Sequence, residues 1–317
     1  MPTLDDQHDD IDLSKAQTEA EWLARLDELG EEVGDFVPLG TRHAAFGLHG
    51  SEAVLLVSFE NAATIRAAGG RQRPMGYEIA VAQGWSALVF VARGDTWFRD
   101  AAVWDHMDRL IDDGFFDGFD RVVFFGAGAC GYAAAAYSVA APGCTVLTVA
   151  PQATLDTARA DWDTRFPQAR RLDFTTRFGY APQMCEAADK VFLIHDPARR
   201  LDSMHASLFA GGNVTRLRTR WLGPDTAREL TSMGVLVPAI EMAGSATLDR
   251  RSFFRLFRQR HSFATYLTRL ALRTEALQRP RLTAIAARAA LTLVRSERLS
   301  EILARAEAAL EARAETV

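Results

Sequence analysis

The sequence predicts an α/β protein built on a mostly parallel, doubly wound sheet. Short continuous apolar runs alternate with segments of helical periodicity, which is the pattern of strands buried on both faces with helices between them. Within residues 121–150, a glycine-rich turn separates one such strand from the helix that follows it. Of the 317 residues, 48% are apolar and 24% are charged, which is ordinary for a soluble globular protein with a sizeable core.

The first elements precede the centre of the sheet. Residues 1–13 are acidic and poor in large apolar groups, so we expect a disordered tail there. Ser14 is the predicted cap of a helix that runs to about Gly30. Two strands are expected around the turn at residues 49–51, and the second of them is a continuous apolar run.

The later elements follow the same alternation and then change character. The expected strands are 85–91, 121–125, 145–149, 190–194 and 214–217, with helices at 101–113 and 132–140. Strand patterns end near residue 234, and three helices are expected beyond it, at 250–273, 280–294 and 299–314. We therefore predict an α/β domain over residues 14–240 and an arginine-rich helical region over 241–317. This helical region either caps the sheet or forms a bundle that binds a partner.

Charge is unevenly distributed along the chain. The net charge is −5, yet residues 250–298 carry twelve arginines against two glutamates, whereas residues 1–35 carry twelve carboxylates. Clustered arginine attracts acidic groups, so an acidic protein partner, or this chain's own N-terminal segment, is expected at the 250–298 helices. Nucleic acid is not expected, because no nucleic-acid-binding motif accompanies this charge and the whole chain is acidic.

The sequence also predicts the cellular compartment and whether any segment could span a membrane. Three cysteines form no even-numbered framework, which favours a reducing compartment. The N-terminal residues lack the apolar core of a signal peptide, and no apolar run is long enough to span a bilayer. We therefore expect a cytoplasmic protein without a membrane span.

The glycine turn fits a dinucleotide-binding pattern. Gly126, Gly128 and Gly131 form G-x-G-x-x-G between a strand and a helix. Such glycines let the backbone approach a pyrophosphate at the helix N-terminus. The acidic residue expected after the following strand is missing, because residues 145–149 run into Ala150-Pro151-Gln152. A nucleotide cofactor such as NAD therefore remains an alternative.

The same turn resembles the nucleophile elbow of α/β-hydrolase-like proteins associated with bacterial surface-polysaccharide and accessory-secretion systems. Their elbow commonly reads G-S-S-M-G-G-Y, where this chain has GAGACGY over residues 126–132. GDTWF over 94–98 is similar to their D-x-x-N-x-W-Y loop, and APQ over 150–152 to their S-P-Q. This resemblance covers residues 45–235 and implies an α/β-hydrolase-like fold.

The catalytic positions implied by the resemblance are mostly lost. The nucleophile position is Gly128, and the histidine position after the last strand is Pro224, whereas Asp196 matches the acid. Since loss of triad members costs orders of magnitude in rate, serine-hydrolase turnover is not expected. Backbone N–H groups around Ala129 still face an anion or a carbonyl oxygen. The sequence thus predicts a catalytically inactive binding or scaffold protein, which the resemblance links to surface polysaccharide.

Other residues are candidates for parts of a site. Asp95 and Trp97 follow a strand's carboxyl end and are expected either to line a ligand pocket or to serve loop structure. Cys130 is either a reactive thiol, which would make the protein an enzyme of another kind, or a small buried residue. An aromatic and arginine-rich stretch over residues 162–180 either covers the site or packs on itself.

The histidines indicate no metal site. His43 and His49 are expected to be exposed beside a turn, and His205 on a helix surface. His195 ends a strand, where a core or orienting role is commoner than metal ligation. The spacings typical of zinc ligands are missing from the sequence.

Overall fold

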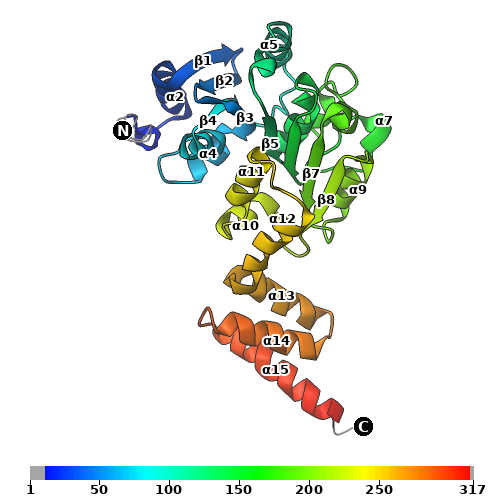
Figure 1. Ribbon diagram of the computed structural model, residues 1–317. Coiled ribbons are helices and arrows are strands. Elements are labelled where there is room, and N and C mark those ends of the chain that lie inside the picture. Colours follow the sequence, from blue (N-terminus) through cyan, green and yellow to red (C-terminus); the bar gives the residue numbers. More distant parts are fainter. Residues whose placement is uncertain (1–10, 315–317) are drawn as a thin grey trace. The chain divides into compact units, whose positions relative to one another are not determined.

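The structure is a computed structural model that describes residues 11–314 (Figure 1). The strands are β1 Gly34–Leu39, β2 His43–Leu48, β3 Ser51–Asn61, β4 Trp85–Ala92, β5 Val122–Ala127, β6 Thr145–Val149, β7 Lys190–His195 and β8 Val214–Arg218. The α-helices are α2 Glu19–Val33, α3 Ala62–Ala67, α4 Met75–Gln83, α5 Ala101–Asp112, α6 Ala129–Tyr137, α7 Thr157–Ala160, α8 Ala181–Met184, α9 Arg200–Leu208, α10 Thr226–Ser232, α11 Leu236–Gly244, α12 Arg250–Leu256, α13 Ala264–Ala276, α14 Pro280–Leu291 and α15 Glu297–Ala314.

The described chain forms two compact units. The first comprises residues 11–218 and 240–248, and the second comprises 219–239 and 249–314. The chain leaves the first unit after Arg218, returns to it at Ile240 and leaves it again after Leu248. None of the described helices is long and apolar enough to cross a membrane.

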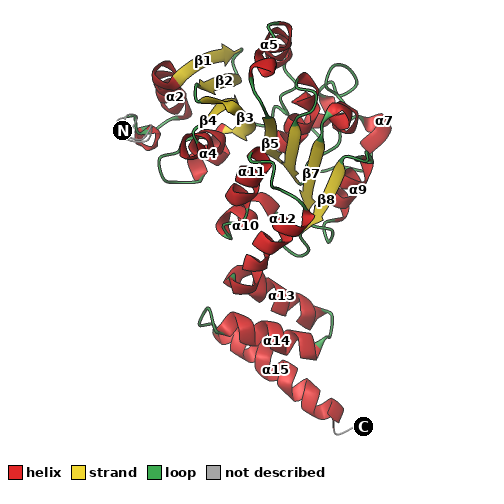
Figure 2. Ribbon diagram, viewed as in Figure 1, coloured by secondary structure: helices red, strands yellow, loops and turns green. Residues whose placement is uncertain are grey.

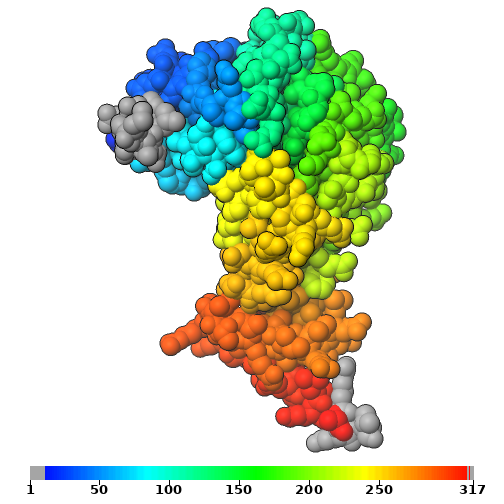
Figure 3. All heavy atoms as spheres, viewed as in Figure 1, coloured from blue at the N-terminus to red at the C-terminus, as the bar shows by residue number. Residues whose placement is uncertain are grey.

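The first unit contains an eight-stranded sheet with the order β1-β2-β4-β3-β5-β6-β7-β8. Strands β3 to β8 run parallel, whereas β2 is antiparallel to both β1 and β4. Helices of this unit lie along the sheet (Figure 2; Figure 3 draws all heavy atoms in the same view). The predicted fold class, a mostly parallel α/β sheet followed by a helical C-terminal region, is confirmed.

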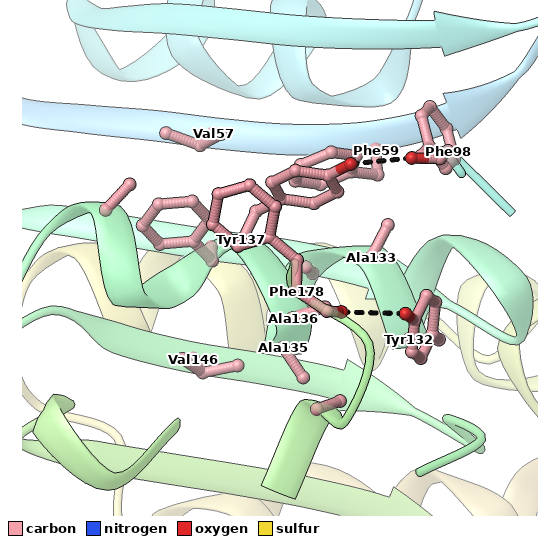
Figure 4. Packing of buried hydrophobic residues seen from close by; sticks show 14 of the residues in the cluster. Val57, Phe59, Phe98, Tyr132, Ala133, Ala135, Ala136, Tyr137, Val146 and Phe178 are labelled. Atoms are coloured by element: carbon pink, nitrogen blue, oxygen red, sulfur yellow. Dashed lines mark hydrogen bonds between the residues drawn. The ribbon is translucent and has the colours of Figure 1, made fainter. Parts of the chain in front are cut away.

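Helix α6 is at the centre of the core. Its residues from Gly131 to Tyr137 are all buried, and it contacts β3, β5 and β6. Four consecutive alanines favour the helical conformation, and their small side chains let the helix axis lie close to the sheet. The hydroxyls of Tyr132 and Tyr137 donate to the carbonyls of Phe178 (2.8 Å) and Phe98 (2.6 Å), which ties two loops to this helix (Figure 4).

Three local expectations need correction. The first long helix is capped by Thr18, whose hydroxyl accepts from Glu21 N–H, while Ser14 lies in a short 3₁₀ turn that Asp12 caps. The helix predicted over 250–273 is interrupted, because α12 ends at Leu256, a 3₁₀ turn covers Phe257–Ser262, and Phe263 is extended before α13 begins. Strand β1 was not anticipated, because it has no apolar run, with Leu39 as its one buried residue, and forms by pairing with β2.

The N-terminal tail is only partly described. Residues 1–10 of the expected disordered segment lie outside the described residues. Leu13, at the end of that segment, is fully buried.

Candidate functional site

The turn between β5 and α6 is a sharp corner with Gly128 at its tip. Gly128 has φ 57° and ψ −123°, a conformation that side-chain-bearing residues rarely adopt. A Cβ at Gly126 would lie 2.2 Å from the Cys130 carbonyl oxygen, so only glycine fits there. A Cβ at Gly128 would meet no described atom within 4 Å. Close packing therefore accounts for Gly126, whereas the tip keeps the space that a side chain would need.

A pocket of about 240 Å³ lies beside this corner. It is lined by residues at the carboxyl ends of three neighbouring strands and by the first residues of α6, namely Asn61, Thr64, Ala92, Gly94, Asp95, Thr96, Trp97, Ala127, Ala129 and Cys130. Strand β3 is flanked by β4 on one side and by β5 on the other, so the sheet grows in opposite directions from β3. The pocket lies at this reversal of strand order. Ligands of open α/β sheets bind at such switch points.

The loop after β4 forms one wall of this pocket in a strained conformation. Trp97 and Phe98 both have positive φ values, 56° and 55°. The Trp97 ring is buried against three other aromatic residues, Tyr132, Phe166 and Phe174. Backbone of this kind persists only where packing over-determines it, and it is concentrated at functional sites. The loop is thus held rigidly at the pocket edge.

A histidine connects this loop to a carboxylate. His43 Nε2 lies 2.6 Å from Thr96 Oγ1, and its Nδ1 lies 3.4 Å from an Asp100 carboxylate oxygen. Phe98 N–H donates to the same hydroxyl at 3.3 Å, so the hydroxyl proton is free to point at His43. Burial lowers the pKa of His43 to about 4, although Asp100 acts in the opposite direction, and the imidazole is neutral near pH 7. The expectation that His43 is exposed was wrong, because its pairing opposite Ala92 encloses it in the sheet, with 3% of the residue exposed.

Two further titratable groups lie near the elbow. Glu60 accepts N–H groups from Met75 and Gly76, both at 2.8 Å, and so caps α4. Burial raises the pKa of Glu60. Burial also raises the pKa of the Cys130 thiol to about 12, and the charge of Glu60 adds to this shift. The thiol is therefore protonated at neutral pH, which is the opposite of an activated nucleophile.

The other two triad positions lie apart from the pocket lining. Asp196 directly follows β7, is buried, and accepts Ala198 N–H at 2.8 Å. Pro224 belongs to the second unit, where Arg269 donates to the neighbouring Leu222 carbonyl and pairs with Glu229 at 2.9 Å. No histidine stands at the predicted base position.

The remaining histidines have structural surroundings. His205 was expected on a helix surface, but it is fully buried because the 162–180 stretch folds over it. Its Nδ1 accepts Ala153 N–H at 3.1 Å and its Nε2 donates to Asp163 at 2.8 Å. His195 is buried, and burial lowers its pKa, with Arg218 adding to the effect. His49 is exposed, as expected, and pairs with Asp35.

The 162–180 stretch packs onto the sheet unit and is fixed there by charge. Arg165 binds Asp163 through two guanidinium nitrogens and Asp202 at 2.6 Å. Burial favours the neutral form of Asp163, but hydrogen bonds from His205 and Arg165 outweigh it and hold its pKa well below the ordinary value.

Metal and dinucleotide sites are not favoured by this geometry. Within residues 11–314, no group of three or more His, Cys, Asp or Glu side chains could hold a metal ion. The strand order differs from the 3-2-1-4-5-6 order of dinucleotide-binding sheets, and 240 Å³ is small even for a drug-sized ligand. A larger hollow of about 300 Å³ lies at the opposite, amino-terminal edge of β5 and β6 and contains no elbow residue.

Sequence reasoning found one part of the pocket and missed another. Asp95, Trp97 and Ala129 line it, whereas Gly126 and Gly131 shape the corner behind it. Thr96 was not proposed as a site residue, although it lies between two that were, and its partner His43 was expected to be exposed beside a turn.

Comparison with known proteins gives only distant likenesses. No family model and no curated protein matches the chain. Among solved structures, carboxyl esterase 2 of Tuber melanosporum aligns at 12% identity over 68% of this chain and 84% of its own, with a TM-score of 0.41. An esterase of Pyrobaculum calidifontis aligns at 12% identity over 78% and 100%, with a TM-score of 0.42. The carboxylesterase EstE1 from a metagenomic library aligns at 12% identity over 73% and 97%, also with a TM-score of 0.42.

Proposed function

We propose that this protein is an α/β-hydrolase-like binding protein whose elbow receives a small acyl- or carboxyl-bearing ligand without attacking it. The observation that carries the proposal is Gly128, which occupies a sharp corner beside a pocket but bears no nucleophile. The first N–H groups of α6 point out of the helix with no intrahelical acceptor, so they can donate to a carbonyl or carboxylate oxygen.

The polar lining supports a hydroxyl-rich ligand. Asn61, Thr64, Asp95 and Thr96 all border the pocket, and such groups fix ligand orientation. Together with the resemblance to surface-polysaccharide proteins, this favours an acylated or carboxylated sugar, held by a scaffold rather than turned over.

A pocket-blocking variant tests the binding site. Thr64→Trp should fill the pocket and abolish binding of N-acetylglucosamine and glucuronate, measured by ligand-observed NMR. Ala63→Trp is the matched control, because Ala63 is equally exposed on α3 but does not line the pocket. Equal binding by both variants, or no binding by the wild-type protein, would contradict the proposal.

A second experiment tests the absence of serine chemistry. A fluorophosphonate probe should label no serine in the intact protein, because position 128 carries only hydrogen. Mass-spectrometric detection of a labelled serine would exclude the inactive elbow.

The chain from Asp100 through His43 to Thr96 favours a second candidate, an enzyme with a displaced nucleophile. A hydroxyl within reach of an oriented base is the usual mark of an activated nucleophile. In this hypothesis Thr96 Oγ1 attacks an ester carbonyl carbon while His43 Nε2 takes its proton. The bond to the alcohol oxygen breaks as His43 returns that proton, and water then releases the acyl group by the same route. Fluorophosphonate labelling of Thr96 that disappears in His43→Gln would support this candidate, and an unlabelled Thr96 would reject it.

A further inference from the structure

Helix α14 of the second unit presents an unusual distribution of side chains. The residues that it buries are small, namely Thr283, Ala284, Ala286, Ala287 and Ala290. Its large apolar residues point outward, with Leu282 53% and Ile285 56% exposed. Amphipathic helices normally bury their large apolar residues. The packing of this unit therefore does not require Leu282 and Ile285.

Exposed large apolar residues are concentrated around this helix. Six residues of this kind occur in the described chain, and five of them fall within residues 277–294: Leu277, Leu282, Ile285, Leu293 and Val294. The sixth is Ile111, in the first unit. Scattered single apolar residues are normal on a surface, whereas a contiguous group marks an interaction site.

The outward residues form a narrow row. Leu282, Ile285 and the half-buried Ala289 are spaced by three and four residues, which places them on one side of α14, and Leu293 follows shortly after the helix ends at Leu291. We call Leu282, Ile285 and Ala289 the α14 stripe. Helix α14 contacts α13 and α15 (Figure 1), and its alanines are largely buried while Leu282 and Ile285 remain exposed. A stripe with this spacing and no aromatic residue fits a single partner helix.

The stripe is bordered by basic charge. Arg281 and Arg288 lie along one edge of it, and Arg295 follows the helix. Arg288 pairs with Glu307, whereas Arg281 and Arg295 make no ion pair within the part of the chain that the structure describes. Residues 219–239 and 249–314 together carry sixteen arginines against eight carboxylates. A second copy of this surface would be repelled by like charge, and an acidic partner would be attracted.

We propose that the α14 stripe binds an acidic amphipathic helix of a partner protein, seated by its apolar residues and oriented by Arg281 and Arg295. This proposal concerns the second unit and is independent of the elbow pocket. The partner helix would carry leucine-like residues at the same three-and-four spacing, with aspartate or glutamate beside them.

A peptide-binding experiment on the full chain tests the proposal. The probe is a fluorescent synthetic helix with leucines at this spacing and flanking glutamates, and fluorescence anisotropy measures its binding. The Leu282→Glu/Ile285→Glu variant should weaken binding by about 30-fold or more, as expected for central apolar contacts. Arg281→Glu should weaken it by a smaller factor that shrinks as salt is added.

Matched controls separate this site from general stickiness. Ile111→Glu removes the exposed apolar residue of the first unit and should leave binding unchanged. A peptide with the same leucines but lysines in place of glutamates should bind much more weakly. Circular dichroism should show unchanged helix content, because the substituted side chains are exposed.

Three results would overturn the proposal. The first is no binding of the acidic peptide, or equal binding of the lysine peptide. The second is a dimer in sedimentation that Leu282→Glu/Ile285→Glu dissociates, which would assign the stripe to a second copy. The third is binding to phosphatidylglycerol vesicles without peptide binding, which would assign it to an anionic lipid surface.

Discussion

The first unit contains two buried imidazoles that each face a carboxylate, and the two arrangements differ in how many of their hydrogen bonds are made. In the pair of His205 and Asp163, both ring nitrogens are hydrogen-bonded and Arg165 binds the carboxylate as well. In the pair of His43 and Asp100, the Nδ1 atom has no hydrogen-bond partner within the described chain and lies 3.4 Å from the carboxylate. The other ring nitrogen contacts a hydroxyl at the pocket edge. The complete pair fastens the 162–180 stretch, whereas the pair at the pocket edge leaves one ring nitrogen without a hydrogen bond in the described chain.

The largest effect should come from breaking the complete pair. Asp163→Asn removes the anion that His205 and Arg165 share, and Arg165 keeps only Asp202, so the substitution should cost about 3 kcal/mol of unfolding free energy. For a unit of this size, the melting temperature should fall by about 6–12 °C in calorimetry. Asp189→Asn, which removes one partner of an exposed pair with Lys190, should change stability by less than about 0.5 kcal/mol. Equal losses of stability in Asp163→Asn and Asp189→Asn would contradict the larger contribution assigned to the buried pair.

The lowered pKa of His43 should make the stability of the protein depend on pH. The pKa of His43 is lowered from 6.5 to about 4, so between these values the unfolded state binds a proton that the folded state does not. Stability should therefore fall by roughly 3 kcal/mol as pH drops through this window and level off below it. His43→Gln should flatten this part of the curve in urea titrations, while His49→Gln, at an exposed position, should leave it in place. The contribution of Asp163, whose pKa is depressed, is lost only at lower pH.

Removal of the hydroxyl should have a smaller effect. Thr96→Val keeps the shape of the side chain but deprives His43 Nε2 of its partner, which should cost about 1 kcal/mol in chemical denaturation. Thr96→Ser, which keeps the hydroxyl, should cost less. A Val variant as stable as the wild type would show that this hydrogen bond contributes no net stability.

The smallest effects should come from substituting Asp100 and Arg42, the two charged residues that act on the pKa of His43. Asp100 raises the pKa of His43 and Arg42 lowers it, so Asp100→Asn should lower this pKa further and Arg42→Gln should raise it. NMR titration of the imidazole measures both shifts. Stability should change by less than about 1 kcal/mol, because the Arg42–Asp100 ion pair is partly exposed. If both variants shifted the pKa of His43 in the same direction, the opposite effects assigned to Asp100 and Arg42 would be wrong.

The sequence predicted the sheet well and the histidine environments poorly, for one physical reason. Strands such as β4 and β7 are continuous apolar runs, so local pattern reports their burial directly. The corner at Gly128 was also predictable, since glycines at fixed spacing between a strand and a helix restrict the backbone to few conformations. Both features depend on nearby residues.

The burial of His43 and His205 depends on distant residues. His43 is enclosed because β2 pairs antiparallel with β4, and His205 because a stretch some forty residues earlier folds over it. No local pattern reports such pairings. The break in the helix before Phe263 was also missed, since no proline or glycine within residues 250–273 indicates it.

The open space at Gly128 has a consequence for substitutions at the corner. With no described atom within 4 Å of a Cβ there, Gly128→Ser would not require the core to repack, and its cost would be the strained backbone alone. At Gly126, by contrast, a Cβ would lie 2.2 Å from the Cys130 carbonyl oxygen, so a serine there would force the backbone apart. The corner therefore tolerates a new side chain at its tip and excludes one at its base.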